Sequence, residues 1–354
     1  MTTTPQLDPD RLDAFVGRFI DDLGTALHVS TVLVGDRLGL YAAMADGAAM
    51  TSAELATRTG TAERYVAEWL AGQAAAGYVS YADGAFRLPP EHAMLLLDSG
   101  APVFIPGGFQ VAASTLKDEP AITDAFRTGR GVGWHEHHPD LFTGCYRFTR
   151  PGYRAHLVAE WLPALDGVTV ALERGASVAD VGCGYGASTI IMARAFPHST
   201  FVGYDNHEPS IEAARRAARD AGLGEQMRFD TAAARDFPGT EYRLVTFFDC
   251  LHDMGDPVGA ATHVRHTLAE DGTWLIVEPY AGHRIEDNLT PVGKVYYNAS
   301  TMICTPASRA QDVGLAMGAQ AGEARIREVA TQAGFTRFRR VAETPVNIVY
   351  EVRP

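Results

Sequence analysis

The chain has 354 residues, more than a single domain usually contains, so we expect two structured units with a connector between them. Its hydrophobic fraction of 46% and charged fraction of 21% are ordinary for globular proteins and exclude a disordered, collagen-like or coiled-coil chain. A formal net charge of −13 repels phosphates at long range, so neither nucleic acid nor an anionic membrane is expected as a partner.

Cysteine usage and the start of the chain indicate the cellular location. The four cysteines, at 145, 183, 250 and 304, show no CxxC pairing, which is typical of a reduced protein without structural zinc. MTTTPQLDPDRLDAF lacks the pattern of a signal peptide, and no apolar stretch is long enough to span a bilayer. We therefore expect a cytoplasmic protein.

The first 98 residues are predicted to form a helical, winged-helix domain. Apolar residues recur at helical spacing over 12–27, and a second helix is expected over 31–44. Thr51 and Glu54 have the spacing of a capping box, and Gly60 ends the helix that they begin. A helix over 61–76 and an ADG turn between two β-rich runs then complete the helix, turn, helix and hairpin of a winged helix.

Residues 99–166 are interpreted as a helical connector and lid. Its most irregular stretch, TGRGVGWHEHHPD, crowds His135, His137 and His138 beside Trp134. No carboxylate or cysteine cluster accompanies these histidines at the usual ligand spacing, so a wall of the substrate pocket is favoured over a metal site. The aromatic residues between 146 and 161 fit the hydrophobic core better than a pocket.

Residues 167–354 are predicted to form an α/β domain of the Rossmann-like kind. Short β-rich runs alternate with helical runs from ASVADVG to TWLIVEP, which indicates parallel βαβ units. Two further strands, RFRRVAE and VNIVYEV, lie close in sequence and are expected to pair antiparallel at one edge of the sheet.

A glycine-rich loop follows the first of these strands. Gly182, Gly184 and Gly186 in VADVGCGYGAS allow a tight turn and close approach of the backbone to a ligand. Asp205 ends the next strand, where a carboxylate can accept hydrogen bonds from ribose hydroxyls. These features suit both NAD and S-adenosylmethionine. Gly186 and Asp180, a carboxylate beneath the loop that suits an ammonium group, favour S-adenosylmethionine.

A candidate base lies after a later strand. FFDCLHDMGDP places His252 at the carboxyl end of that strand, where ligands of open α/β sheets bind. Methyl transfer to a hydroxyl requires removal of a proton, and histidine titrates near neutral pH, so His252 is either a general base or a wall of the cofactor pocket. Glu278, which ends the next strand, orients His252, contacts substrate or caps the strand. The segment 286–308 is long enough to cover a pocket, with Tyr296, Tyr297 and Asn298 as candidates.

The glycine loop resembles motif I of class I S-adenosylmethionine-dependent methyltransferases, and the runs ending at Asp205, Asp249 and Glu278 match that family in order. The resemblance implies that Asp180 and the loop hold the methionine part and that Asp205 holds the ribose. The family's acidic contact to the adenine amino group aligns with Ala233, so that contact is missing, and residues 234–236 line the adenine rim.

The segment LHDM is similar to the His-Asp-Trp motif of plant-type small-molecule O-methyltransferases, in which the histidine is the general base and the N-terminal domain is a winged helix. Met254 replaces the tryptophan. As a whole the chain resembles an actinobacterial group of winged-helix methyltransferases through DCLHDMGDP, EDNLTPVGKVYYNASTMICTPAS and NIVYEVRP. The acceptor does not follow from this family.

The leading hypothesis is therefore a methyltransferase that uses S-adenosylmethionine on a small molecule, most readily on an oxygen nucleophile. Candidate catalytic residues are His252 and Glu278, and no metal is expected. Candidate cofactor contacts are Asp180, Gly182, Gly184, Gly186, Asp205, Asn206, Ala234, Arg235 and Asp249. Candidate substrate contacts are Trp134, His135, His138, Tyr146, Tyr153, Tyr296 and Asn298. By likeness to the plant-type enzymes, a homodimer through the N-terminal domain is expected.

The alternative is a winged-helix regulator that binds S-adenosylmethionine without catalysis. Charges in the helix over 61–76 are Glu63, Arg64 and Glu68, whereas a helix that reads DNA presents several Arg or Lys side chains. A dehydrogenase is disfavoured by Gly186 and by the lack of a second mononucleotide-binding half. A fourth possibility, which the sequence does not exclude, is a methyltransferase fold that binds the cofactor and uses the sulfonium charge for another reaction.

Overall fold

The computed structural model describes residues 7–98, 100–224 and 226–354, and the chain divides into two compact units, 1–113 and 114–354. None of the helices in these described ranges combines the length and apolar character that a membrane crossing requires. The N-terminal unit is a helical winged helix, and the C-terminal unit is a Rossmann-like α/β domain.

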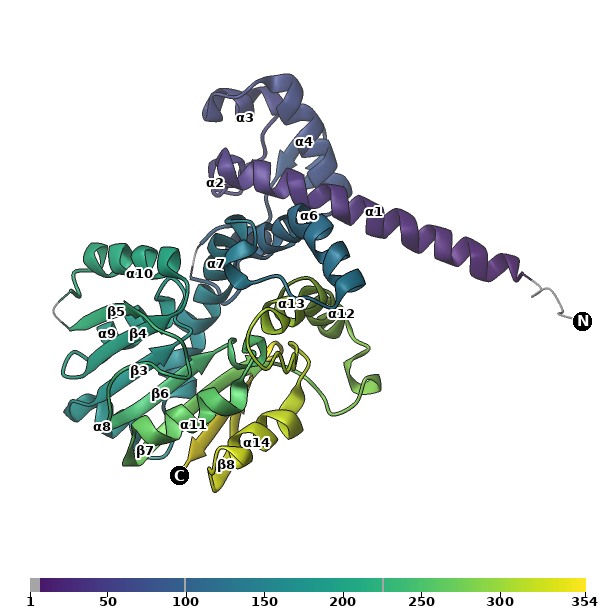
Figure 1. Cartoon of the computed structure of the whole chain (residues 1–354). Coiled ribbons are helices and arrows are strands. Elements are labelled where there is room, and N and C mark those ends of the chain that lie inside the picture. The colour runs from purple at the N-terminus through teal and green to yellow at the C-terminus, as the bar shows by residue number, and fades with distance from the viewer. Residues whose placement is uncertain (1–6, 99, 225) are drawn as a thin grey trace, which may run out of the picture. The chain divides into compact units, whose positions relative to one another are not determined.

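The N-terminal unit begins with one long helix, α1 (Pro9–Arg37), followed by the short α2 (Leu40–Ala43). The expected break between residues 27 and 31 is absent, because the intervening residues include neither glycine nor proline. The chain turns instead at Gly39, whose φ of 67° lies in the left-handed region that glycine adopts readily. The first half of α1 extends beyond the other helices of this unit (Figure 1).

The predicted helix, turn, helix and hairpin are confirmed in α3 (Ser52–Thr59), α4 (Glu63–Ala75), β1 (Ser80–Ala82) and β2 (Ala85–Arg87). Thr51 and Glu54 form the expected capping box. Asp83 and Gly84 both have positive φ, as a two-residue hairpin turn with the right-handed twist of its strands requires. α5 (Pro90–Leu96) follows, and α6 (Ile105–Thr128) crosses the boundary between the two units.

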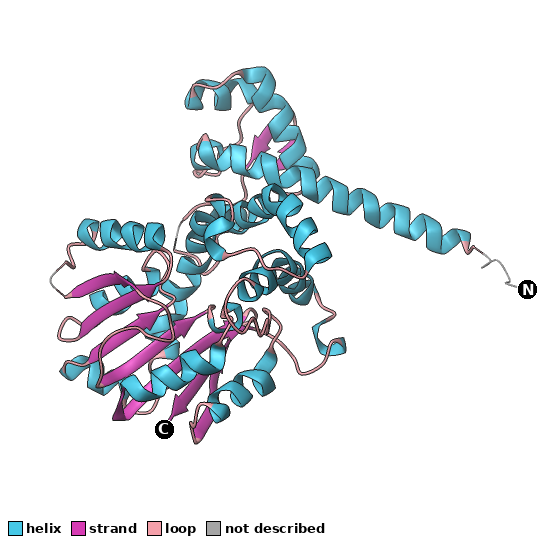
Figure 2. Ribbon diagram, in the orientation of Figure 1, coloured by secondary structure: helices cyan, strands magenta, loops and turns pink. Residues whose placement is uncertain are grey.

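The C-terminal unit is built on a seven-stranded sheet in the order β5-β4-β3-β6-β7-β9-β8 (Figure 2). The strands are β3 (Ser177–Val181), β4 (Thr200–Asp205), β5 (Met227–Thr231), β6 (Tyr242–Phe248), β7 (Leu268–Pro279), β8 (Arg337–Glu343) and β9 (Asn347–Arg353). The first five are parallel, as the alternating pattern predicts. β9 runs antiparallel to both of its neighbours and lies one place in from the edge, which β8 forms.

Helices cover both faces of this sheet. α8 (Val168–Arg174), α9 (Ala187–Ala195) and α10 (Glu208–Asp220) pack on one face with Val178, Leu244 and Leu275 beneath them. α11 (Pro257–Thr267) and α14 (Gly322–Gln332) pack on the other face over Ala179, Val245 and Ile276 (Figure 1). The alternation of side chains along each buried strand thus divides the core into two layers.

Two further helical segments lie at the carboxyl end of the sheet. The first comprises a 3₁₀ turn (Trp134–Glu136), α7 (Asp140–His156) and a π-helical turn (Leu157–Trp161). The second lies between β7 and α14 and comprises a 3₁₀ turn (Glu286–Asn288), α12 (Pro291–Ala299), a π-helical turn (Ser300–Cys304) and α13 (Thr305–Arg309). Between α6 and α7 the chain is irregular, as the glycine-rich sequence predicts.

Candidate functional site

The glycine loop joins β3 to α9, and Asp205 at the end of β4 holds it in place. The Asp205 carboxylate accepts hydrogen bonds from the Gly184 N–H and from the His207 N–H, each at 2.9 Å. Burial raises the pKa of Asp205, and the two N–H donors partly offset this rise. Gly182, Gly184 and Gly186 all have positive φ. An added Cβ at Gly184 would meet no heavy atom within 4 Å, so open space lies above the loop.

Asp180 lies beneath the loop, almost fully buried. It accepts hydrogen bonds from three hydroxyls, those of Ser188 at 2.6 Å, Thr189 at 2.5 Å and Thr246 at 2.9 Å. Burial raises the pKa of Asp180, and the hydroxyl donors oppose that rise. Its carboxylate therefore ties the start of α9 to β3 and β6, and it shapes the loop from below.

One face of α7 lies along the ends of three neighbouring strands. Phe142 packs on His207 after β4, with ring centroids 4.3 Å apart. One turn further on, Tyr146 packs on Tyr185 of the glycine loop at 5.6 Å. Tyr153, two turns beyond that, donates its hydroxyl hydrogen to Asp249 after β6 at 2.8 Å. Residues four and seven positions apart share a helix face, so α7 forms a wall along the carboxyl end of the sheet.

Asp249 follows β6 with a φ of 51°, a conformation that L-residues other than glycine rarely adopt. One carboxylate oxygen accepts from Tyr153, and the other accepts from the Asn347 side chain at 2.8 Å. Burial, and then the nearby Glu278 carboxylate, raise the pKa of Asp249 to about 7. This acid therefore changes its protonation state near neutral pH.

His252 is held between two carboxylates. Its Nδ1 lies 2.6 Å from Glu278 at the end of β7, and its Nε2 lies 3.1 Å from Asp253 Oδ1. Glu278 also accepts from the Leu251 N–H at 3.0 Å, which fixes the carboxylate. Burial lowers the pKa of His252, but Asp253 and Glu278 outweigh burial and place the pKa well above its usual value. Of the roles considered for Glu278, the contacts match orientation of His252.

Cys304 completes the surroundings of the histidine. Among the described residues, one group could hold a metal ion by spacing: ligand atoms of His252, Asp253 and Cys304 lie within 4.8 Å of one another. Burial raises the pKa of the Cys304 thiol to about 12, so the sulfur is protonated at neutral pH. The Asp253 Oδ1 atom is buried and makes no well-aligned hydrogen bond within the described chain. The region around Nε2 is thus polar and electrically negative.

Comparison with known proteins identifies both units. Residues 172–334 match the family model described as "Methyltransferase domain". The chain carries a methyltransferase domain. Residues 25–97 match the model described as "Rv2258c-like winged HTH domain". The predicted methyltransferase domain and the predicted winged helix are thereby confirmed.

Individual relatives match the chain over limited lengths. A polyketide synthase, ThaQ, from Burkholderia thailandensis is 32% identical over 114 residues, which cover 32% of this chain and 5% of that protein. The chain spans between 5% and 41% of the length of the curated relatives that it matches.

Solved structures resemble the chain over nearly its full length. The mitomycin 7-O-methyltransferase MmcR has a TM-score of 0.69 at 18% identity and covers 98% of this chain and 100% of its own. Human N-acetylserotonin methyltransferase, solved in complex with S-adenosylmethionine, has a TM-score of 0.68 at 17% identity and covers 99% of each chain. At these identities the likeness shows an O-methyltransferase-like fold.

Several other predicted residues lie near the strand ends of the methyltransferase domain. The Tyr296 hydroxyl donates to the Val346 carbonyl at 2.7 Å. Burial raises the pKa of Tyr296, with smaller contributions from Asp249 and other groups around His252. Ala234 is half-buried against the core layer of α11 and α14. Trp134 packs on Phe142 with ring centroids 5.4 Å apart.

Other predicted residues are exposed to solvent or contact neighbouring residues of the chain. Arg235 forms an exposed ion pair with Asp312 at 3.1 Å, and Asn206 and His135 are exposed. Asn298 is exposed and donates to the Lys294 carbonyl of its own helix at 2.7 Å. His138 Nδ1 accepts from the Asp140 N–H at the start of α7. These contacts give the residues local structural partners, and their proposed ligand contacts stay predictions.

Sequence reasoning missed three residues that the fold brings to the site. Asn347 of β9 donates a hydrogen bond to Asp249, and Cys304 lies beside His252. The His207 ring packs on Phe142, and the His207 N–H donates to Asp205. The position of His207 two residues after the strand-ending acid was a usable signal. No local pattern marks Asn347, which lies 98 residues from its partner.

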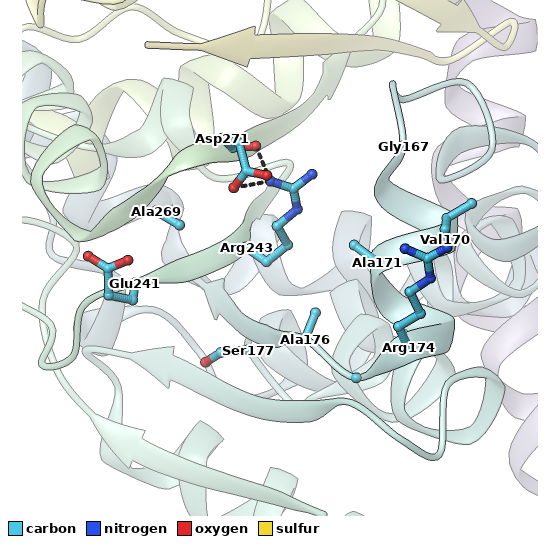
Figure 3. Close-up of a pocket in the computed structure, with 11 residues that line it drawn as sticks. Gly167, Val170, Ala171, Arg174, Ala176, Ser177, Glu241, Arg243, Ala269 and Asp271 are labelled. Atoms are coloured by element: carbon cyan, nitrogen blue, oxygen red, sulfur yellow. Dashed lines mark hydrogen bonds and ion pairs between the residues drawn. The ribbon is translucent and has the colours of Figure 1, made fainter.

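A depression of about 470 Å³ lies at the opposite end of the sheet of the methyltransferase domain (Figure 3). Arg243 and Asp271, near the starts of β6 and β7, form an ion pair within it, and Arg174 of α8 lies across from them. Ser177, the first residue of β3, lines its floor. This depression therefore lies at the amino ends of the strands and is separate from the candidate site.

Proposed function

We propose that this chain transfers the methyl group of S-adenosylmethionine to an oxygen nucleophile of a small molecule, with His252 as the general base. The observation that carries the proposal is the Glu278–His252 pair at 2.6 Å, in which His252 follows β6 and Glu278 lies in the last residues of β7, on the sheet end that bears the glycine loop. A carboxylate that accepts the Nδ1 hydrogen of a histidine leaves Nε2 to accept a proton.

The residues at the strand ends fit S-adenosylmethionine. Space above Gly184 admits a ligand against the backbone, and the Asp205 oxygens, each with one N–H donor, keep lone pairs for two ribose hydroxyls. Asp180 already accepts three hydroxyls, so we assign the ammonium group to Asp249. The cofactor, when bound, supplies a methyl group on a sulfonium, which is intrinsically reactive.

The protein residues then act on the acceptor. As the acceptor oxygen forms its bond to the methyl carbon and the carbon–sulfur bond breaks, the hydroxyl proton passes to His252 Nε2. The products are a methyl ether, S-adenosylhomocysteine and an imidazolium. Glu278 and Asp253 stabilise that imidazolium, because both carboxylates lie within 3.1 Å of the ring nitrogens. Alignment of the oxygen with the methyl group supplies a further part of the rate.

Cofactor binding tests the first part of this proposal. Isothermal titration should show binding of S-adenosylmethionine and S-adenosylhomocysteine but not of NAD. Asp205→Ala should weaken S-adenosylhomocysteine about 100-fold, because two hydrogen bonds to a charged group are lost. Asp230→Ala, which removes an exposed carboxylate of the neighbouring β5, is the matched control. An unchanged affinity of a folded Asp205→Ala protein would contradict the assignment. Release of S-adenosylhomocysteine over a panel of phenols and hydroxy acids then identifies the acceptor.

The regulator alternative is not supported by the second helix of the winged helix. Arg64 is the one cationic side chain of α4, and it forms an exposed ion pair with Glu68. Glu63 adds another negative charge to the same helix. DNA phosphates would meet little positive charge there.

We further propose that the protein is a homodimer that pairs through α1. Exposed apolar side chains follow one stripe of α1, including Phe15 at 70%, Phe19 at 54% and Leu27 at 67% exposed. A stripe at such spacing is typical of a helix that packs on another surface, and nothing in the described part of the chain covers it. A second copy offers an identical stripe and would bury both.

Charge placed on this stripe should separate the copies. Light scattering after gel filtration should give a dimer for the wild type and a monomer for Phe15→Asp combined with Phe19→Asp. Asp21→Lys, which introduces a similar change of charge on the opposite face of α1, should stay dimeric. A wild-type monomer at micromolar concentration would refute the proposal.

A further inference from the structure

The segment between α6 and α7 runs from the surroundings of His252 to those of Asp205. At its start, the Gly131 backbone lies so close to α13 that an added Cβ would meet the Ala310 nitrogen at 2.0 Å. The Val132 N–H donates to the Pro306 carbonyl of α13 at 3.1 Å. α13 follows directly after Cys304. At the other end, Phe142 packs on His207, whose N–H contacts Asp205. The segment therefore connects the two parts of the candidate site, the surroundings of His252 and those of Asp205.

His137 lies near the α7 end of this segment and is 4% exposed. Its Nδ1 lies 2.9 Å from Asp118 Oδ2 on α6, and the same carboxylate accepts the His138 N–H at 3.1 Å. Trp134 meets the imidazole edge to face at 6.3 Å. The ring is thus held on one side by an acid and on another by an indole, which fixes its orientation.

The second ring nitrogen has no partner within the described chain. His137 Nε2 is buried and makes no hydrogen bond there. Asp118 accepts the hydrogen of Nδ1, so the neutral ring presents a bare lone pair at Nε2. A buried acceptor without a donor is unfavourable, and buried polar atoms of this kind require an explanation. Such a nitrogen is suited to a hydroxyl or N–H group of a bound molecule.

We propose that His137 Nε2 accepts a hydrogen bond from a hydroxyl group of the ligand bound at the candidate site, and that Asp118 holds the ring in the tautomer that allows it. The proposal rests on the proposed methyltransferase function. Two hydroxyl sources share this chemistry, the ribose of the cofactor and the methyl acceptor. His137 would then recognise the cofactor or the methyl acceptor, depending on which of the two supplies the hydroxyl group.

Histidine NMR tests this directly. In protein labelled with ¹⁵N-histidine, the His137 Nε2 signal is assigned by its loss in His137→Asn and followed during titration with S-adenosylhomocysteine. A shift toward the hydrogen-bonded position with S-adenosylhomocysteine alone indicates the ribose. A shift only after addition of the acceptor found by the methyl-transfer panel indicates the acceptor. Either outcome supports the proposal.

Two substitutions give a second readout. His137→Asn keeps an N–H for Asp118 but lacks an atom at the Nε2 position, whereas His137→Gln reaches that position. His137→Asn should weaken the Kd of S-adenosylhomocysteine, or raise the KM of the acceptor, about 10-fold, and His137→Gln should restore part of the loss. Calorimetric binding of S-adenosylhomocysteine with no Nε2 shift from either ligand would overturn this inference alone. Absence of any such binding would overturn the proposed function and this inference with it.

Discussion

Replacement of His252 by alanine should lower kcat by about two to four orders of magnitude, while the affinity for S-adenosylhomocysteine stays close to that of the wild type. The reason is that a general base acts on the acceptor proton and contributes little to binding of the cofactor. The measurement is release of S-adenosylhomocysteine under saturating cofactor, paired with calorimetry on the same preparation. An equal loss of cofactor binding would show that His252 is a wall of the pocket.

The pH dependence of kcat separates the base role from a structural one. A base must be neutral, so kcat should rise with pH through the pKa of His252 and then level off. Asp253 and Glu278 raise that pKa, so Asp253→Asn should move the rising limb toward lower pH. Glu278→Gln should also move the limb to lower pH and reduce kcat, because the ring loses its orienting carboxylate. A limb that stays in place in both variants would contradict proton transfer to His252.

Replacement of Gly186 by alanine should lower the free energy of unfolding of the methyltransferase domain by about 2–5 kcal/mol. Gly186 has a φ of 77°, which costs roughly 1–2 kcal/mol for an L-residue, and its added Cβ would meet the Phe229 ring at 2.6 Å and Ala214 Cβ at 3.1 Å. Overpacking of a buried site of this kind costs about 1–3 kcal/mol more. Urea unfolding followed by tryptophan fluorescence measures the change in midpoint.

Gly184→Ala is the matched control for this effect. Its φ of 53° carries the same backbone cost, but the added Cβ would meet nothing within 4 Å. We expect a loss of only about 1–2 kcal/mol in stability and a clear loss of S-adenosylhomocysteine affinity, because the methyl group would occupy the space above the loop. Equal stability of the two variants would mean that Phe229 and Ala214 move aside for the added methyl group at little cost in free energy.

Local patterns predicted the features that depend on neighbouring residues. The capping box at Thr51, the glycine loop and the two closing strands each follow from spacings within a few residues. His252 and Glu278 could be placed because the alternation predicts both strands: His252 follows β6, and Glu278 lies at the end of β7. Their mutual contact then follows from the adjacency of β6 and β7.

Local sequence patterns could not predict contacts between segments that lie far apart in the chain. The Asp118–His137 pair joins a helix to an irregular segment, and neither residue lies in a periodic run that would assign its direction. The prediction that the helix is interrupted between residues 27 and 31 was wrong, because the spacing of apolar residues does not by itself end a helix. The helix ends instead just before Gly39. Likewise, the spacing of the aromatic residues between 146 and 161 indicated a core position for Tyr153, but it could not show that the Tyr153 hydroxyl donates to Asp249.

The position of β9 links the last strands of the chain to the candidate site. β9 pairs with β7 on one side and with β8 on the other, so the β8–β9 hairpin joins the rest of the sheet through β9. Asn347, the first residue of β9, supplies one of the two side-chain donors to Asp249. The acid that follows β6 is therefore fully coordinated only after the last strand of the sheet has been inserted. A nascent domain that lacks β9 would present β7 as an open edge and an incompletely coordinated Asp249, which makes completion of the fold and maturation of the candidate site one event.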